Sequence, residues 1–268
     1  MASKKLIFFD IDGTIVTDNG GKRIIPQSTI QAIRTLQSNG HLCFINTGRA
    51  LTEIDESIRS LQMDGFVCGC GTYIAHQDTV LFHKTIPTSL GNRILKEFEI
   101  CDLEWVLEGS QNLYFSQLPY RTHIGDFKKE FSDVFSIAFD AVAPEDAHDL
   151  VFDKFCICAH EQSNVSRFMD KFQDDLSFID RGNHFFEVIP TGCSKASGIR
   201  FLMDHFSVAH EDTLAIGDST NDLPMLEYAG VSIAMGGSDP VVCQSADIVT
   251  APILEDGLYK AFDFLHLL

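Results

Sequence analysis

The chain has 268 residues, of which 45% are hydrophobic and 22% are charged, so it can form one large folded domain or two modest ones. Its 20 basic and 38 acidic residues give a net charge of −18, which disfavours nucleic acid and anionic membranes as partners. No apolar run approaches the length of a membrane span or a signal peptide. Eight dispersed cysteines without a CxxC pair disfavour a zinc site and favour a reducing cytoplasm.

Four short apolar runs predict buried parallel strands. Each run is bounded by glycine or by polar residues, and each is apolar on both faces, as in a sheet covered by helices on both sides. Between the first two runs, Pro26 and Ser28 indicate the start of a helix that Gly40 ends. This alternation predicts an α/β fold with a doubly wound, mainly parallel, Rossmann-like sheet. The four runs are Leu6–Phe9, Leu42–Ile45, Thr213–Ile216 and Val231–Ala234.

The middle of the chain has a different pattern, typical of an α+β unit. A hairpin is predicted around Gly109–Asn112, and an amphipathic helix is predicted behind Ser163 as its N-cap. Further strands are predicted at Phe135–Phe139, Phe155–Ala159 and Phe185–Ile189. We therefore expect a catalytic core of residues 1–83 and 187–268, with an inserted cap domain over residues 84–186.

Two carboxylates follow the first predicted strand directly, in the sequence Asp10-Ile11-Asp12-Gly13-Thr14. Ligands of an open parallel sheet bind beyond the carboxyl ends of its strands, so both acids should lie at the binding crevice. One acid can then act as nucleophile and metal ligand while the other serves as general acid and base. The alternative is an ordinary strand-end turn with solvated acids.

Three further clusters contribute to the same expected crevice. Thr47 and Gly48, which follow the second predicted strand, suit a phosphate oxygen, and the alternative is simple helix capping. Lys195 precedes a helical pattern, and taken alone it is typical of a surface lysine. Asp218 and its acidic neighbours on the loop after Thr213–Ile216 suit a hard cation such as Mg²⁺, or else an acidic helix N-terminus. A nucleophile, an acid/base, a hydroxyl, a lysine and a metal loop are together what phosphoryl transfer needs.

In this order and spacing, the motifs resemble those of the haloacid dehalogenase-like hydrolase superfamily, and specifically its Cof-type phosphatases. The D-x-D-G-T pattern is matched by Asp10–Thr14, T-G-R by Thr47–Arg49, the motif lysine by Lys195, and G-D-x-x-N-D-x-x-M by Gly217–Met225. The long gap between the second and third motifs matches the Cof-type position of the cap. Gly69–Thr72 departs from the Asn-Gly-Ala common there.

The resemblance implies a role for each matched residue. Asp10 would attack phosphorus, and Asp12 would protonate the leaving oxygen and then activate water. Asp10, the backbone carbonyl of Asp12, and Asp218 would hold Mg²⁺. The phosphoryl oxygens would be bound by Thr47, Gly48 and Lys195, with Asn221 and Asp222 orienting the lysine and the metal site.

The predicted function is thus a Mg²⁺-dependent phosphatase for small phosphorylated metabolites, most of all sugar phosphates. The alternatives are a phosphomutase of the same superfamily and a non-catalytic sensor of phosphorylated ligands. In the cap, two polar loops are candidates to touch the leaving group. They contribute Arg181 and His184, and Arg121 and His123. The sequence leaves the physiological substrate open, and it does not distinguish a monomer from a dimer.

Overall fold

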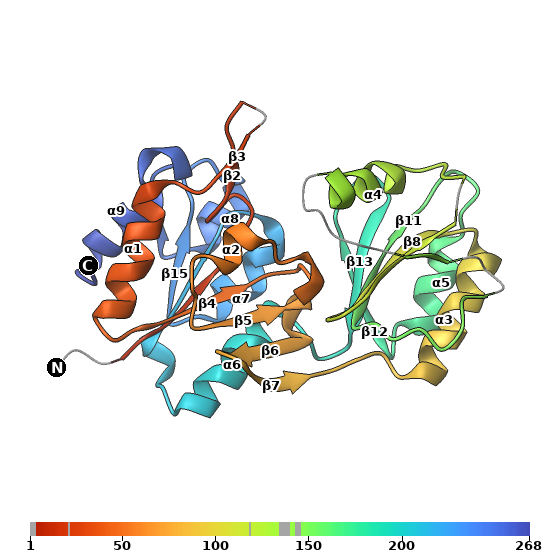
Figure 1. Cartoon of the computed structure of the whole chain (residues 1–268), viewed down its shortest axis with the longest axis horizontal. Helices are drawn as coiled ribbons and strands as arrows, with labels where there is room; N and C mark the ends of the chain where they lie inside the picture. Colours follow the sequence, from red (N-terminus) through yellow and green to blue (C-terminus); the bar gives the residue numbers. More distant parts are fainter. Residues whose placement is uncertain (1–3, 21, 118, 134–139, 143–145) are drawn as a thin grey trace. The chain divides into compact units, whose positions relative to one another are not determined.

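The structure is a computed structural model that describes residues 4–20, 22–117, 119–133, 140–142 and 146–268 (Figure 1). The chain forms two compact units. The first consists of Met1–Gly48, Ser57–Leu81 and Ser194–Leu268, and the second of Arg49–Glu56 and Phe82–Cys193. None of the described helices is long and apolar enough to cross a membrane.

The first unit is built on an eight-stranded sheet in the order β16-β15-β14-β1-β4-β5-β6-β7. All four strands predicted for the core are present, and they pair with one another or with β5 and β16 in parallel. β6 runs antiparallel to β5. The predicted mainly parallel sheet is therefore confirmed. Its strands are β1 (Leu6–Phe9), β4 (Leu42–Asn46), β5 (Gly65–Cys68), β6 (Tyr73–His76), β7 (Thr79–His83), β14 (Thr213–Gly217), β15 (Val231–Ala234) and β16 (Ile248–Val249).

Helices cover both faces of this sheet. Successive strand residues point to opposite faces, and Phe8 lies against Phe44, which in turn lies 6.0 Å, ring to ring, from Phe206 of α6. Phe9 lies 5.7 Å from Phe262 of α9 on the other face. The sheet is thus doubly wound, as predicted. The helices are α1 (Gln27–Ser38), α2 (Glu56–Arg59), α6 (Lys195–Phe206), α7 (Leu223–Tyr228), α8 (Pro240–Ser245) and α9 (Gly257–Phe264).

Short elements complete the first unit. A two-stranded hairpin of β2 (Thr17–Asp18) and β3 (Arg23–Ile24) lies between β1 and α1 in the sequence. Single 3₁₀ turns connect several strands and helices. They are η2 (Gly69–Gly71), η4 (His210–Asp212), η5 (Thr220–Asp222) and η6 (Ile253–Glu255).

The second unit contains a six-stranded sheet in the order β10-β9-β8-β11-β13-β12. Its described pairs are antiparallel except β9 with β10, which is parallel. The predicted hairpin around Gly109–Asn112 is confirmed as β8 and β9, whereas the predicted strand Phe135–Phe139 lies outside the described residues. The strands are β8 (Glu104–Glu108), β9 (Leu113–Ser116), β10 (Asp140–Val142), β11 (Lys154–Cys158), β12 (Leu176–Asp180) and β13 (Phe185–Pro190).

Helices pack on both sides of this second sheet as well. α3 (Thr88–Cys101) and α5 (Val165–Phe172) bury Phe98, Phe168 and Phe172 against one face. α4 (Ile124–Asp133) packs on the other face, and η1 (Leu51–Glu53) belongs to the same unit. The N-cap of α5 is Asn164 rather than the predicted Ser163. Its side chain accepts a hydrogen bond from the Arg167 amide, whereas the Ser163 hydroxyl donates to the Asp102 carbonyl.

The limits of the second unit are close to the boundaries expected for the cap. The predicted return to the core, between residues 186 and 187, falls inside β13, whose last five residues pair with β12 and which belongs to the second unit. The segment Arg49–Glu56, which the sequence assigns to the core, also packs with the second unit. Because β13 pairs with β11 and β12 of the second sheet as far as Pro190, the second unit extends to Cys193.

Candidate active site

Asp10 lies at the carboxyl end of β1, and its side chain is buried. Lys195, the first residue of α6 and 1% exposed, donates a hydrogen bond of 2.6 Å from Nζ to Asp10 Oδ1 and a second, shorter one to Asp222. Ser194 caps this helix and fixes its first turn. Asn46 at the end of β4 donates to the Lys195 carbonyl over 3.0 Å. The lysine is therefore a buried site residue, and its reading as a surface lysine is wrong.

The loop after β14 brings Asp218 and Asp222 to the same place. One Asp222 oxygen accepts hydrogen bonds from the amides of Asp218 and Ser219, each 3.0 Å long, while the other accepts from Lys195. Asn221 accepts a short hydrogen bond from the Ser219 hydroxyl on this loop. Asp222 thus joins the loop to the lysine, and the orienting role that the resemblance implies for it stays a prediction.

Gly13 is required by the close approach of this loop to the turn after β1. Its φ is +81°, and a Cβ placed on it would lie 2.1 Å from Asp218 Oδ2. Thr14, which is fully buried, donates from Oγ1 to Asp218 Oδ1 over 3.4 Å. The D-x-D-G-T segment therefore supplies the carboxylates of Asp10 and Asp12 and also fixes the position of the Asp218 side chain.

Negative charge is crowded in this site. Burial raises the pKa of Asp10 to about 7, and the charge of Asp222 adds to the shift, which Lys195 only partly offsets. The pKa of Asp218 is raised to about 7 for the same reasons. Burial would lower the pKa of Lys195, but Asp10 and Asp222 outweigh it and raise that pKa. The carboxylates exceed the cations, so another cation would stabilise their charged forms.

The carboxylates fit a hard divalent ion. Oxygen atoms of Asp10, Asp218 and Asp222 all lie within 4.8 Å of one another. Carboxylate oxygen is the donor that Mg²⁺ prefers, and the crowding of negative charge that helps to raise the pKa values of Asp10 and Asp218 favours a positive charge there. Both oxygens of Asp222 already accept hydrogen bonds, one from Lys195 and the other from two backbone amides. Asp10 and Asp218 are therefore the side chains best able to hold the ion. The predicted contribution of the Asp12 carbonyl stays a prediction.

The phosphate-binding candidates Thr47 and Gly48 follow β4 directly, and Thr47 is 2% exposed. The Thr47 amide donates to the Val67 carbonyl, and the Thr47 carbonyl accepts from the Cys70 amide. The unusual Gly69–Thr72 sequence therefore still supports this loop. Gly71 lies so close to α6 that a Cβ on it would be 2.5 Å from the Ser194 carbonyl oxygen. These contacts place the Thr47 loop beside the start of the helix that carries Lys195.

Asp12 differs from Asp10 in its surroundings. Its side chain is 55% exposed, and Arg23 Nη2 of β3 lies 3.4 Å from its Oδ1. The exposure suits a group that must exchange protons with substrate and water, and Arg23 is a neighbour that the sequence did not predict. The charge of Asp12 also contributes to the raised pKa values of Asp10 and Asp218.

In the second unit, Arg181 belongs to a buried charged cluster. Its Nε lies 3.0 Å from a Glu187 oxygen, and Lys154 Nζ lies 2.7 Å from both Glu187 and Glu108. Burial would raise the pKa of Glu187, but Lys154 and Arg181 outweigh it and lower that pKa to about 2. Burial and the nearby Glu108 raise the pKa of Glu53 to about 8. Arg181 is thus held within the cap sheet, and its predicted contact with a leaving group stays a prediction.

The other cap candidates lie in loops at one end of this sheet. Arg121 pairs with Asp102 through two guanidinium nitrogens. The His123 ring lies 5.5 Å from that of Phe185, the residue after His184. The structure therefore brings the 121–123 and 181–184 loops to the same end of the sheet, where their part in recognition stays a prediction.

The sequence missed the cluster of Glu53, Glu108, Lys154 and Glu187. A signal was present: Glu104, Glu108, Lys154 and Glu187 interrupt strand patterns that are otherwise apolar. Charged residues at every second or fourth strand position share one face, and so they mark a polar face of the sheet.

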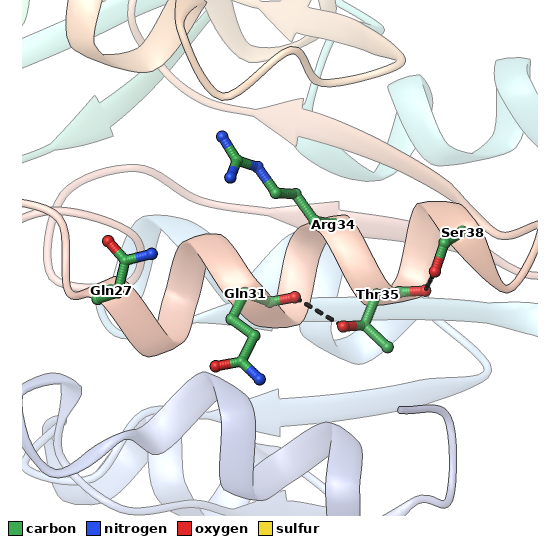
Figure 2. A pocket seen from close by; sticks show the side chains of 5 residues that line it. All are labelled: Gln27, Gln31, Arg34, Thr35 and Ser38. Carbon is green, nitrogen blue, oxygen red and sulfur yellow. Dashed lines mark hydrogen bonds between the residues drawn. The ribbon is translucent and has the colours of Figure 1, made fainter.

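A shallow depression of about 380 Å³ on α1 lies outside this site (Figure 2). Its hydrogen bonds are those of a helix surface: the Thr35 hydroxyl donates to the Gln31 carbonyl, and the Ser38 hydroxyl donates to the Thr35 carbonyl. It contains none of the predicted site residues. The lining side chains are Gln27, Gln31, Arg34, Thr35 and Ser38.

Comparison with known proteins gives matches over the whole chain. A model of the haloacid dehalogenase-like hydrolase family matches residues 7–262. Bacillus subtilis (strain 168) YkrA is 30% identical over 268 residues, covering 98% of each chain. The 5-amino-6-(5-phospho-D-ribitylamino)uracil phosphatase YitU of the same strain is 27% identical, covering 95% of each chain. The solved structure of the subclass IIB sugar phosphatase BT4131 is 28% identical with a TM-score of 0.83, covering 99% of this chain and 100% of that one.

These matches confirm the predicted fold and the predicted Cof-type resemblance. The predicted enzyme class, a phosphoric monoester hydrolase, is confirmed by the family match together with relatives that are themselves named phosphatases. With its motifs assembled around Asp10 and a match from residue 7 to residue 262, the chain belongs to the haloacid dehalogenase-like hydrolase family.

Proposed function

We propose that this enzyme is a Mg²⁺-dependent phosphatase that hydrolyses small phosphorylated metabolites, above all sugar phosphates, through an aspartyl-phosphate. The observation that carries the proposal is the buried Asp10 carboxylate. It is oriented by the 2.6 Å hydrogen bond from Lys195 and lies in a group of three acids that favours a cation. A carboxylate placed in this way can attack a phosphoryl group whose own charge is neutralised.

In the first step, an Asp10 oxygen forms a bond to phosphorus while the bond to the leaving oxygen breaks. The exposed Asp12 gives a proton to that oxygen, and Thr47, the Gly48 amide and Lys195 bind the phosphoryl oxygens. In the second step Asp12 takes a proton from water, which attacks phosphorus and releases Asp10. Two displacements on one centre let a single acid/base serve both.

Mg²⁺ held by Asp10 and Asp218 would neutralise phosphoryl charge that otherwise repels the attacking carboxylate. Asp222 and Asn221 keep the 218–222 loop and Lys195 in place through the contacts described above. The Thr14 hydroxyl holds the Asp218 side chain by a hydrogen bond, and Gly13 leaves room for that side chain because it has no Cβ.

The substrate class is supported by relatives. BT4131 is named a sugar phosphatase, and YitU is named for a substrate that carries a phospho-D-ribityl group. Both names join the phosphate to a polyhydroxylated carbon chain. A cap sheet with polar loops at one end offers hydrogen-bond groups for such a chain, so Arg121, His123, Arg181 and His184 remain the proposed contacts. A cytoplasmic location and a small phosphorylated metabolite as partner complete the proposal.

The phosphomutase alternative is disfavoured by the chain between the first two motifs. In its described part, the segment from Asp12 to Thr47 holds only a short hairpin and α1, which leaves no room for a cap there. The sensor alternative is disfavoured because Asp10, Asp12, Lys195 and Asp218 are all present and the described contacts assemble Asp10, Lys195 and Asp218.

The test is an initial-rate screen over a broad panel of phosphorylated metabolites with Mg²⁺, with Asp10→Asn as the control. We expect turnover of sugar phosphates by the wild type and a loss of at least ~10⁴-fold in kcat in the variant. Phosphoryl transfer between two hydroxyls of one substrate, without release of phosphate, would instead favour a mutase. Tight binding without turnover would favour a sensor.

A further inference from the structure

Arg23 stands beside the proposed acid/base residue, although no motif of the family includes it. Its Nη2 lies 3.4 Å from Asp12 Oδ1, and its side chain is only 24% exposed. An arginine on a two-residue strand would ordinarily extend into solvent, because lysine and arginine carry long, strongly solvated side chains. Here the guanidinium is turned toward the site.

Two local backbone features, a tight turn and a hairpin, bring Arg23 to this place. The amides of Ile15 and Val16 both donate to the Ile11 carbonyl, and the Gly13 amide donates to Val16, so the chain reverses tightly after β1. The β2–β3 hairpin that follows pairs Thr17 with Ile24 and Asp18 with Arg23. The hairpin thus returns Arg23 to the level of Asp12.

The other cation of the site is committed elsewhere. Lys195 donates to Asp10 and to Asp222 and is 1% exposed. Asp12 lies at the exposed side of the site, where a short carboxylate can adopt several rotamers. Arg23, 3.4 Å from Asp12 Oδ1, is therefore a cation placed to restrain it.

We propose that Arg23 is a positioning residue for Asp12: its guanidinium holds Oδ1 of the Asp12 carboxyl group, so that the other oxygen, which carries the proton, is oriented to give that proton to the leaving oxygen. This inference rests on the proposed phosphatase function. A general acid must lie within about 2.6–3.2 Å of the atom it protonates, and a misplacement of about 1 Å can reduce the rate on the order of 100-fold. Arginine suits the task because its planar group offers several donors in a fixed geometry, which lysine does not.

The inference predicts a loss that depends on the leaving group. Replacing Arg23 leaves Asp10, Lys195 and Asp218 untouched, so attack on phosphorus is preserved. A sugar alkoxide must be protonated as it leaves, whereas a nitrophenolate leaves without a proton. Loss of Asp12 positioning should therefore impair hydrolysis of a sugar phosphate far more than hydrolysis of p-nitrophenyl phosphate.

The experiment measures kcat/KM of wild type, Arg23→Ala, Arg23→Lys and Lys22→Ala with the best primary sugar phosphate of the panel and with p-nitrophenyl phosphate. Lys22 is the matched control, because it is an exposed cation on the same hairpin. We expect Arg23→Ala to lose roughly 10- to 100-fold on the sugar phosphate and less than about threefold on p-nitrophenyl phosphate. Arg23→Lys should recover part of the loss, and Lys22→Ala should change neither value by more than about twofold.

A double variant separates positioning from a general effect on the hairpin. In an Asp12→Asn background, Arg23→Ala should cause no further loss, because the residue through which Arg23 acts is already disabled. An equal loss on both substrates, an additive loss in the double variant, or the same loss in Lys22→Ala would overturn the inference. If Arg23→Ala does not fold, Arg23→Lys and Arg23→Gln undergo the same comparison. A wild type that hydrolyses no phosphate ester would refute the proposed function itself, whereas an active wild type with an unaffected Arg23→Ala would refute only the role of Arg23.

Discussion

Replacing Gly13 with alanine should disable the enzyme through Asp218, a residue more than 200 positions away in the sequence. The new Cβ would lie 2.1 Å from Asp218 Oδ2, and an ordinary contact begins at 3.4 Å, so the carboxylate must move by about 1.3 Å. A displacement of this size at a catalytic group costs on the order of 100-fold in rate. Loss of a well-placed metal ligand should also raise the Mg²⁺ concentration needed for half-maximal activity.

The same substitution carries a backbone cost, which a matched control isolates. Gly13 has a φ of +81°, and a residue with a Cβ pays about 1–2 kcal/mol in that conformation. Gly40 has a φ of +89° in the same unit, but a Cβ on it would meet nothing within 4 Å. Gly40→Ala should therefore lose a similar amount of stability, about 2–4 °C in Tm for each kcal/mol, and keep its activity.

The assay is the initial rate as a function of Mg²⁺ concentration, with Tm measured on the same samples. We expect Gly13→Ala to lose roughly 100- to 1000-fold in kcat, and Gly40→Ala less than about twofold. If Gly13→Ala keeps a third of wild-type turnover at low Mg²⁺, or if Gly40→Ala loses as much, the contact between Gly13 and Asp218 does not control the site.

Three further predictions concern charge. The pKa values of Asp10 and Asp218 are raised from 3.8 to about 7, so the metal-free site loses stability as pH rises across that range, and its affinity for a cation increases until both acids are ionised above pH 7; the rise in Tm caused by Mg²⁺ should be larger at pH 8 than at pH 6, and an equal rise in Asp218→Asn would contradict this. The pKa of Glu53 is raised from 4.5 to about 8, so wild type should lose stability as pH rises across that range; the stability advantage of Glu53→Gln over wild type should be larger at pH 9 than at pH 6 by at least ~1 kcal/mol, whereas an advantage that shrinks with pH would show that Glu53 is needed in its charged form. Arg181→Ala should lower kcat/KM for the best sugar phosphate by roughly 10- to 150-fold and for a minimal aryl phosphate by less than about threefold; equal losses would mean that Arg181 serves the Glu187 cluster rather than the substrate.

The core could be predicted because its signals are local. The runs Leu6–Phe9 and Val231–Ala234 are strands with those same bounds, since strands buried on both faces must be apolar throughout. The placement of Lys195 against Asp10 was different in kind. Those residues are 185 positions apart, and the sequence around each of them does not predict that they are in contact. Only the resemblance to a family predicted that they share a site.

The cap was less predictable for a physical reason. Its charged cluster joins Glu108, Lys154 and Glu187, which come from three strands whose pairing the sequence does not reveal. The return to the core was placed inside β13 because an apolar strand looks the same whichever sheet it joins. Ser163 and Asn164 are both good N-caps, so the choice between them depends on the Asp102 carbonyl that Ser163 binds.

The two buried charge clusters differ in how far their acids are balanced by cations, and this difference indicates which cluster binds a ligand. In the cap, Lys154 and Arg181 match Glu108 and Glu187, and the pKa of Glu187 falls to about 2, so the charged state is stabilised by the protein alone. In the core, Lys195 faces Asp10 and Asp222 with Asp218 close by, and the pKa values of Asp10 and Asp218 rise to about 7 instead. In the cap cluster Glu108 and Glu187 have their counter-charges, while burial and the nearby Glu108 raise the pKa of Glu53 to about 8, so this third acid is neutral at pH 7 and adds no charge that a further cation would have to balance. The core cluster favours one more cation at neutral pH, which supports the proposed role of Asp10 as a nucleophile that attacks once a bound cation balances the buried acids.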